Sequence, residues 1–107
     1  MNNNVKIVID AGHGGSDPGA SGNGLVEKEY ALKIADYLNN RFKELGVNST
    51  LVRSTDETVT PTDRTNRILN AYGNSPDVLV ISNHLNAGGG DSQSVTNKSI
   101  TIKAKKQ

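Results

Sequence analysis

Two short apolar segments, each followed by a glycine-rich stretch, constrain the fold of this chain most strongly. They are residues 5–10 (VKIVID) and 77–82 (DVLVIS), and both are rich in β-branched residues. Nearly every residue in them is apolar, whereas a half-exposed strand would alternate apolar with polar residues. We therefore predict that both segments are strands buried on both faces of a parallel sheet.

The sequence between these strands has helical periodicity. From Glu27 onward, apolar residues recur at three- and four-residue spacing as far as Leu45, and Gly46 follows as a typical C-terminal stop. Glu27 and Glu29 then occupy the first turn of this long helix. Acidic residues are favoured there because they face the positive end of the helix dipole.

A second strand and a shorter helix complete the pattern. Residues 49–53 (STLVR) form a strand candidate, and Thr60 followed by Pro61 supplies an N-cap and a first-position proline for a helix that ends near Gly73. The resulting βαβαβ order predicts an α/β fold in which helices flank a mostly parallel sheet.

Composition limits both the size and the chemistry of this domain. The chain has 107 residues, of which 34% are hydrophobic, so it has room for one small core. A net charge of +1 gives no electrostatic footprint for nucleic acid, and no apolar run approaches the roughly 20 residues that span a membrane. The absence of cysteine leaves histidine and carboxylates as the strong metal ligands. The N-terminal residues lack the pattern of a signal peptide, so we expect synthesis in the cytoplasm.

The two histidines of the chain both follow predicted strands. His13 lies three residues after the first strand, between Gly12 and Gly14, and His84 lies two residues after the third. Because ligands bind at the carboxyl ends of strands in open α/β sheets, both are candidate site residues. Glu27, at the start of the helix that returns from the first loop, would point back toward them. Two imidazoles and a carboxylate are ligands that zinc prefers.

Other interpretations of these residues stay open at this point. Either histidine could be a hydrogen-bonded loop residue, and Glu27 could simply stabilise the start of its helix. The loop GHGGSD also approaches the GxGxxG fingerprint of dinucleotide-binding proteins. Against nucleotide binding, Asp17 replaces the last glycine and would set a carboxylate near a pyrophosphate, and Pro18 stiffens the turn.

Three segments resemble the zinc-dependent N-acetylmuramoyl-L-alanine amidases. They are residues 9–20 (IDAGHGGSDPGA), 24–28 (GLVEK) and 81–87 (ISNHLNA). In that family, the histidine of the first motif, the glutamate of the second and the histidine of the third bind one zinc ion. The matching positions in this chain, in the same order, are His13, Glu27 and His84.

The resemblance implies a reaction and a place of action. Members of this family, which include phage lysins and autolysins, use zinc to hydrolyse the amide bond between N-acetylmuramic acid and L-alanine in bacterial peptidoglycan, at the cell wall. Arg53 and Arg64 match arginines in the family's strand and following helix, where they either order loops or contact substrate.

The resemblance weakens after Gly90. We expect residues 1–90 to be the N-terminal part of the amidase domain, and residues 91–107 to be a divergent tail with a short strand and a basic end. The fold would then be incomplete relative to the family's six-stranded domain, and the family's late catalytic glutamate has no counterpart. The last glutamate, Glu57, lies too early in the chain, which leaves Asp91 as the nearest acidic substitute.

Two functions are compatible with this sequence. The first is a truncated zinc amidase that has little activity by itself. The second is a non-catalytic remnant that binds zinc, and the cell wall, without cutting it.

Overall fold

A four-stranded parallel sheet forms the centre of the molecule. The computed structural model describes residues 4–86 and 98–105. The strand order in the sheet is β4-β1-β5-β6, and every neighbouring pair is parallel. The strands are β1 (Lys6–Ala11), β4 (Asn48–Leu51), β5 (Val78–Asn86) and β6 (Lys98–Lys105).

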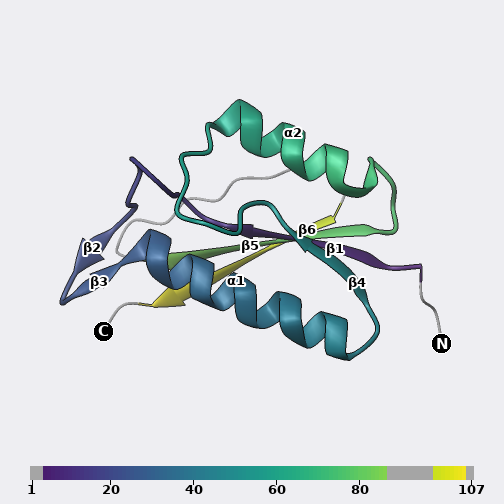
Figure 1. Cartoon of the computed structure of the whole chain (residues 1–107), viewed down its shortest axis with the longest axis horizontal. Coiled ribbons are helices and arrows are strands. Elements are labelled where there is room, and N and C mark those ends of the chain that lie inside the picture. The colour runs from purple at the N-terminus through teal and green to yellow at the C-terminus, as the bar shows by residue number, and fades with distance from the viewer. Residues whose placement is uncertain (1–3, 87–97, 106–107) are drawn as a thin grey trace.

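Two helices cover opposite faces of this sheet (Figure 1). The longer helix, α1 (Glu27–Glu44), packs against β1, β4 and β5, and α2 (Pro61–Tyr72) lies on the other face. The predicted α/β architecture, a parallel sheet flanked by helices, is therefore confirmed. Neither of these described helices is long and apolar enough to cross a membrane.

The core lies in two layers because successive residues of a strand point to opposite faces of the sheet. In β1, Ile7 and Ile9 face α1, whereas Val8 between them faces α2. The burial of β1 on both faces confirms the interpretation of its apolar run. The α1 layer contains Ile7, Ile9, Ala11, Ala31, Ala35 and Ile81, and the α2 layer contains Val8, Val52, Ile68, Val78 and Val80.

The helix ends follow the sequence signals. The Thr60 side chain accepts a hydrogen bond from the Asp63 backbone N–H at 3.1 Å, and Pro61 occupies the first helical position. Gly73 ends α2 with a φ of 84°, and Gly46 follows α1 with a φ of 78°. Both values lie in the left-handed region that glycine adopts without steric cost, which explains why the helices end there.

Strand β5 is longer than the sequence predicted. We expected it to end at Ser82 with His84 beyond it, and this is wrong: β5 continues to Asn86, and His84 lies within it. The reason is pairing with β6, which runs in register from Leu79 to Asn86 and keeps the backbone extended through the mostly polar residues SNHLN. Local sequence gives no signal for this extension because the partner strand is distant in the chain.

The first glycine-rich loop contains a small hairpin that the sequence did not predict. Its two strands, β2 (Ser21–Gly22) and β3 (Leu25–Val26), pair antiparallel. Asn23 and Gly24 between them have φ values of 53° and 79°, as a tight hairpin turn requires. The hairpin leads the chain from the loop after β1 directly into α1.

Candidate metal centre

His13 lies in the loop after β1, in a backbone conformation that is uncommon for a residue with a side chain. Its φ is 64°, and Gly14 and Gly15 after it also have positive φ values. The reversal of the chain at these residues turns the imidazole back over the end of the sheet. The side chain keeps 25% of its surface exposed, so a ligand can reach it.

His84 is held beside the end of β1 by a close approach of backbone and ring. A Cβ atom on Gly12 would lie 2.6 Å from His84 Cε1, a distance that real atoms do not reach, so this position requires glycine. The neighbouring residue Asn83 is buried, and its side-chain amide donates to the Ala31 carbonyl of α1 at 2.8 Å. These contacts fix β5 relative to both β1 and α1.

Glu27 is the first residue of α1 and the buried member of the group. Its side chain is 5% exposed. Its backbone N–H donates to the Ala20 carbonyl at 2.8 Å, and its Oε1 accepts from the Ala20 N–H at 2.9 Å. Ala20, in the loop before the hairpin, therefore holds both the backbone N–H and Oε1 of Glu27, and Oε2 is left directed at the histidines.

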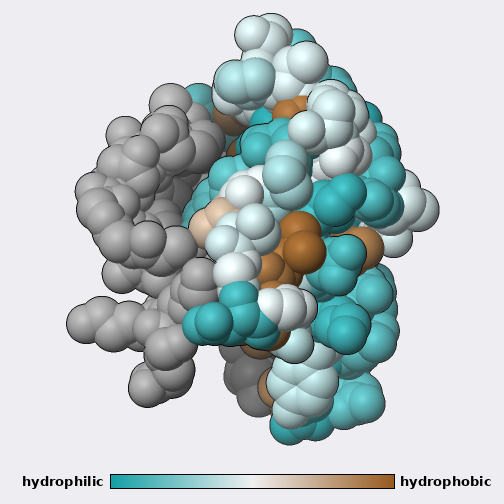
Figure 2. Space-filling model, turned by 90° about the vertical axis from the view of Figure 1, so that its left-hand side faces the viewer, coloured by the Kyte–Doolittle hydropathy of each residue, from teal (hydrophilic) through white to brown (hydrophobic). Residues whose placement is uncertain are grey.

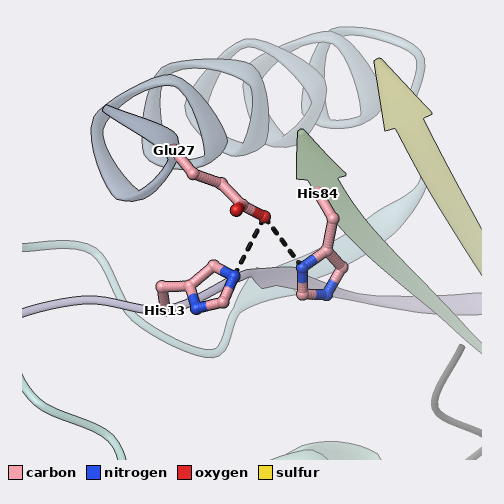
Figure 3. Close-up of side chains that lie close together, drawn as sticks. All are labelled: His13, Glu27 and His84. Carbon is pink, nitrogen blue, oxygen red and sulfur yellow. Dashed lines mark hydrogen bonds and ion pairs between the residues drawn. The ribbon is translucent and has the colours of Figure 1, made fainter. Parts of the chain in front are cut away.

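The three side chains converge on one point (Figure 3). Glu27 Oε2 lies 2.9 Å from His13 Nε2 and 3.2 Å from His84 Nδ1. One ligand atom from each residue lies within 4.8 Å of the other two. The structure thus brings together residues that are 14 and 57 positions apart in the sequence (13 to 27, and 27 to 84).

This arrangement fits a metal ion in both chemistry and size. Two imidazole nitrogens and one carboxylate oxygen are a donor set that zinc prefers, and three protein ligands leave a fourth position free. Zinc–ligand bonds of about 2.0–2.1 Å in a tetrahedron place ligand atoms about 3.3 Å apart. The two distances from Glu27 Oε2 are close to that value.

Asp17 holds the other side of the His13 ring. Its Oδ2 lies 2.8 Å from His13 Nδ1, and its Oδ1 accepts from the Gly19 N–H at 3.1 Å. The hydrogen bond from His13 lowers the pKa of Asp17, so the side chain is a carboxylate at neutral pH. Sequence reasoning considered Asp17 only as an obstacle to nucleotide binding and missed this contact.

Arg53 ties the segments that carry His13 and Glu27 to each other. It is 2% exposed and donates to the carbonyls of Ala11, Gly12 and Thr55, and to that of Lys28 just after Glu27. Burial lowers the pKa of Arg53, although a guanidinium stays charged in proteins. Its planar fork reaches several carbonyls at once, which a lysine ammonium does not do.

Arg64 supports the same loop from α2. It forms an ion pair with the buried carboxylate of Asp10, and it donates to the His13 carbonyl at 2.9 Å. Ser82 donates to the other oxygen of Asp10 at 3.0 Å. The contacts of both arginines with protein groups therefore order the loop around His13, one of the two roles that the sequence left open.

The candidate site lies at the carboxyl-end face of the sheet. Figure 2 shows this face, and the described surface on it is mostly hydrophilic, with a few hydrophobic residues between the polar ones. Asp91, the acidic substitute that the sequence suggested, lies outside the described residues.

Comparison with known proteins gives a consistent match. The family model described as N-acetylmuramoyl-L-alanine amidase matches residues 7–105. This match extends through β6, beyond the last motif recognised in the sequence.

Individual relatives give the same result. The chain is 48% identical over 90 residues to the sporulation-specific N-acetylmuramoyl-L-alanine amidase of Bacillus subtilis (strain 168), which covers 80% of this chain and 33% of that protein. It is also 48% identical over 88 residues to the N-acetylmuramoyl-L-alanine amidase CwlM of Bacillus licheniformis, with the same two coverages of 80% and 33%. The chain thus spans about a third of the length of these curated relatives.

A solved structure supports the assignment at the level of the fold. The catalytic domain of CwlV, an N-acetylmuramoyl-L-alanine amidase from Bacillus (Paenibacillus) polymyxa var. colistinus, superposes with a TM-score of 0.67 at 30% identity, over 80% of this chain and 48% of that one. Fold, sequence and family model agree, and the chain belongs to the N-acetylmuramoyl-L-alanine amidase family.

Proposed function

We propose that this chain binds one zinc ion through His13 Nε2, Glu27 Oε2 and His84 Nδ1, and that it serves hydrolysis of the amide between N-acetylmuramic acid and L-alanine in peptidoglycan. The observation that carries the proposal is the convergence of both histidines on one oxygen of Glu27. Membership of the amidase family supports the choice of reaction. The place of action is the bacterial cell wall.

The metal and the residues that hold it would have different roles in such a site. Zinc supplies Lewis acidity to amide hydrolysis, since it polarises a carbonyl and lowers the pKa of water. Ala20 holds Oε1 of Glu27, so that Oε2 stays directed at the two histidines. The described surface on the carboxyl-end face of the sheet is mostly hydrophilic, which suits a substrate made of sugar and peptide (Figure 2).

The late catalytic glutamate of the family has no counterpart in this sequence. Glu57 is the last glutamate in the sequence, and its side chain pairs with Arg67 at 2.9 Å. That contact lowers the pKa of Glu57 and engages its carboxylate in an ion pair with α2. Asp91 remains the acidic candidate later in the chain.

We therefore expect slow hydrolysis by the 107-residue chain itself. A positioned general acid or base contributes about two to four orders of magnitude to the rate. The measurement is the release of new L-alanine amino groups from purified peptidoglycan, with and without a chelator, beside the complete Bacillus subtilis relative. The expected release by this chain is chelator-sensitive and slower than that of the relative by this factor.

Two results would contradict this expectation in different ways. Release no greater than that of a His84→Ala variant would favour the alternative function, a domain that binds zinc and the cell wall without catalysis. Release as fast as that of the relative, and lost in an Asp91→Asn variant, would show that Asp91 completes the site.

A further inference from the structure

We infer that Asp17 is a positioning residue for the metal centre: it holds the proton of His13 on Nδ1 and thereby leaves Nε2 free to bind the metal. The inference rests on the proposed function, because it assigns His13 Nε2 as a metal ligand. Asp17 would be a fourth side chain of the site. It does not bind the metal itself, but it determines which nitrogen of His13 is able to bind it.

The two ring nitrogens of His13 face two different carboxylates. Nδ1 lies 2.8 Å from Asp17 Oδ2, and Nε2 lies 2.9 Å from Glu27 Oε2. A neutral imidazole carries one N–H, and a carboxylate only accepts, so the ring can donate to one of the two at a time. If Nε2 held the proton, its lone pair would be unavailable to a metal. Glu27 favours the Nε2–H form when no metal is bound, and Asp17 opposes it, because a carboxylate on Nδ1 favours the tautomer in which Nε2 is free.

Asp17 is itself held in place by the loop that it closes. Gly14 N–H donates to the Asp17 carbonyl at 2.8 Å, and Asp17 N–H donates to the Gly14 carbonyl at 3.0 Å. Gly19 N–H then binds the carboxylate oxygen that His13 does not use, at 3.1 Å. Gly14 thus fixes the backbone of Asp17 and Gly19 fixes its carboxylate, as the orientation of a metal ligand requires.

The contact contributes little as an ordinary surface ion pair. The Asp17 side chain is 63% exposed, and pairs at such positions add little to the stability of the fold. An Asp17 variant should therefore fold, and an effect on the metal centre can be separated from an effect on folding.

His84 provides a contrast within the same site. Its Nδ1 faces Glu27, and within the part of the chain that the structure describes its other nitrogen makes no hydrogen bond. Removal of Asp17 should therefore change the tautomer of His13 and leave that of His84 unchanged.

The experiment compares Asp17→Asn with a matched variant, Asp36→Asn, in the 107-residue chain. Both remove one exposed carboxylate of the same size, but Asp36 lies on the surface of α1, away from the site. An asparagine at position 17 offers Nδ1 a donor as well as an acceptor, so it removes the preference for the Nδ1–H form. The first readout is the ring ¹⁵N chemical shifts of both histidines in metal-free protein, recorded at the same pH for every variant. The second is the zinc dissociation constant from competition with a chromophoric chelator.

We expect Asp17→Asn to change both the tautomer of His13 and the affinity for zinc. The share of the Nδ1–H tautomer of His13 is equal in the native chain and in Asp36→Asn; in Asp17→Asn the Nε2–H form increases and His84 does not change. Zinc affinity falls by about 10- to 100-fold in Asp17→Asn and is unchanged in Asp36→Asn.

Contrary results would separate this inference from the proposed function. A His13 tautomer ratio in Asp17→Asn equal to that of the native chain, or zinc affinity unchanged in Asp17→Asn, would overturn the role of Asp17 and leave the metal centre standing. A native chain that binds no zinc would instead overturn the metal centre, and with it the assigned purpose of Asp17.

Discussion

At the scale of single residues, glycines matter to this site as much as the ligands do. A Cβ atom on Gly19 would lie 2.6 Å from His13 Cδ2 and 2.7 Å from Glu27 Oε1. Gly19 also has a φ of 71°, a conformation that costs other residues about 1–2 kcal/mol. Position 19 therefore requires glycine for two reasons: the positive φ of its backbone, and the close approach of the His13 and Glu27 side chains.

We predict that Gly19→Ala weakens zinc binding at least tenfold, because the added methyl group must displace His13 or Glu27. The control is Gly24→Ala. Gly24 has a similar φ of 79°, but a Cβ atom added there would have no other atom within 4 Å. Both variants should lose about 1–2 kcal/mol of stability from the backbone conformation alone. Equal zinc affinities in the two variants, measured by chelator competition, would show that the close contact at Gly19 is unimportant.

Sequence reasoning identified part of this residue-scale picture. His13 and Glu27 follow from ligand chemistry, their places next to a strand and a helix start, and the family motifs. The contact of Asp17 does not, because it depends on three-dimensional closure of the loop through Gly14 and Gly19. The four carbonyls bound by Arg53 belong to segments far apart in the chain, and residue type alone does not indicate them.

At the scale of elements, local signals predicted the helices better than the strands. Thr60, Pro61 and Gly73 mark the ends of α2 correctly because capping depends on residues within one turn. Strand ends depend on pairing with distant segments. The polar residues at the end of β5 stay extended because β6 lies beside them, and the two-residue strands of the hairpin are too short for any periodicity to emerge.

The cap of α2 gives a prediction at this scale. Thr60→Ala removes the side-chain acceptor for the Asp63 N–H, and we expect a loss of about 1 kcal/mol in the free energy of unfolding. In a domain of this size that corresponds to a fall of about 4–8 °C in the melting temperature. Thr65→Ala, at an exposed position inside α2, is the control and should change little. Equal melting temperatures for both variants would argue against the cap.

At the scale of the whole molecule, the core is thin and the proposed metal centre links three separate segments of the chain. Among the described residues, one helix covers each face of the sheet, and His13, Glu27 and His84 come from the loop after β1, from α1 and from β5. A ligand that binds the folded state and not the unfolded state raises the free energy of unfolding by mass action. Zinc should therefore contribute an unusual share of the stability of this small domain.

We predict that a chelator lowers the melting temperature of the 107-residue chain. Zinc at about 100 times its dissociation constant adds about 2.7 kcal/mol, equivalent to roughly 10 °C or more for a chain of this length. Thermal melts followed by circular dichroism, with zinc and with excess chelator, measure the difference. Superimposable melts would contradict a stabilising metal centre.

The measurement that tests the central claim most directly is the zinc content of the purified chain, by elemental analysis, in the native protein and in a His13→Ala, His84→Ala double variant. Three ligands around a single point predict about one zinc ion per native chain, and close to none in the double variant. A zinc content that stays near one per chain without both histidines would contradict the assignment of this site.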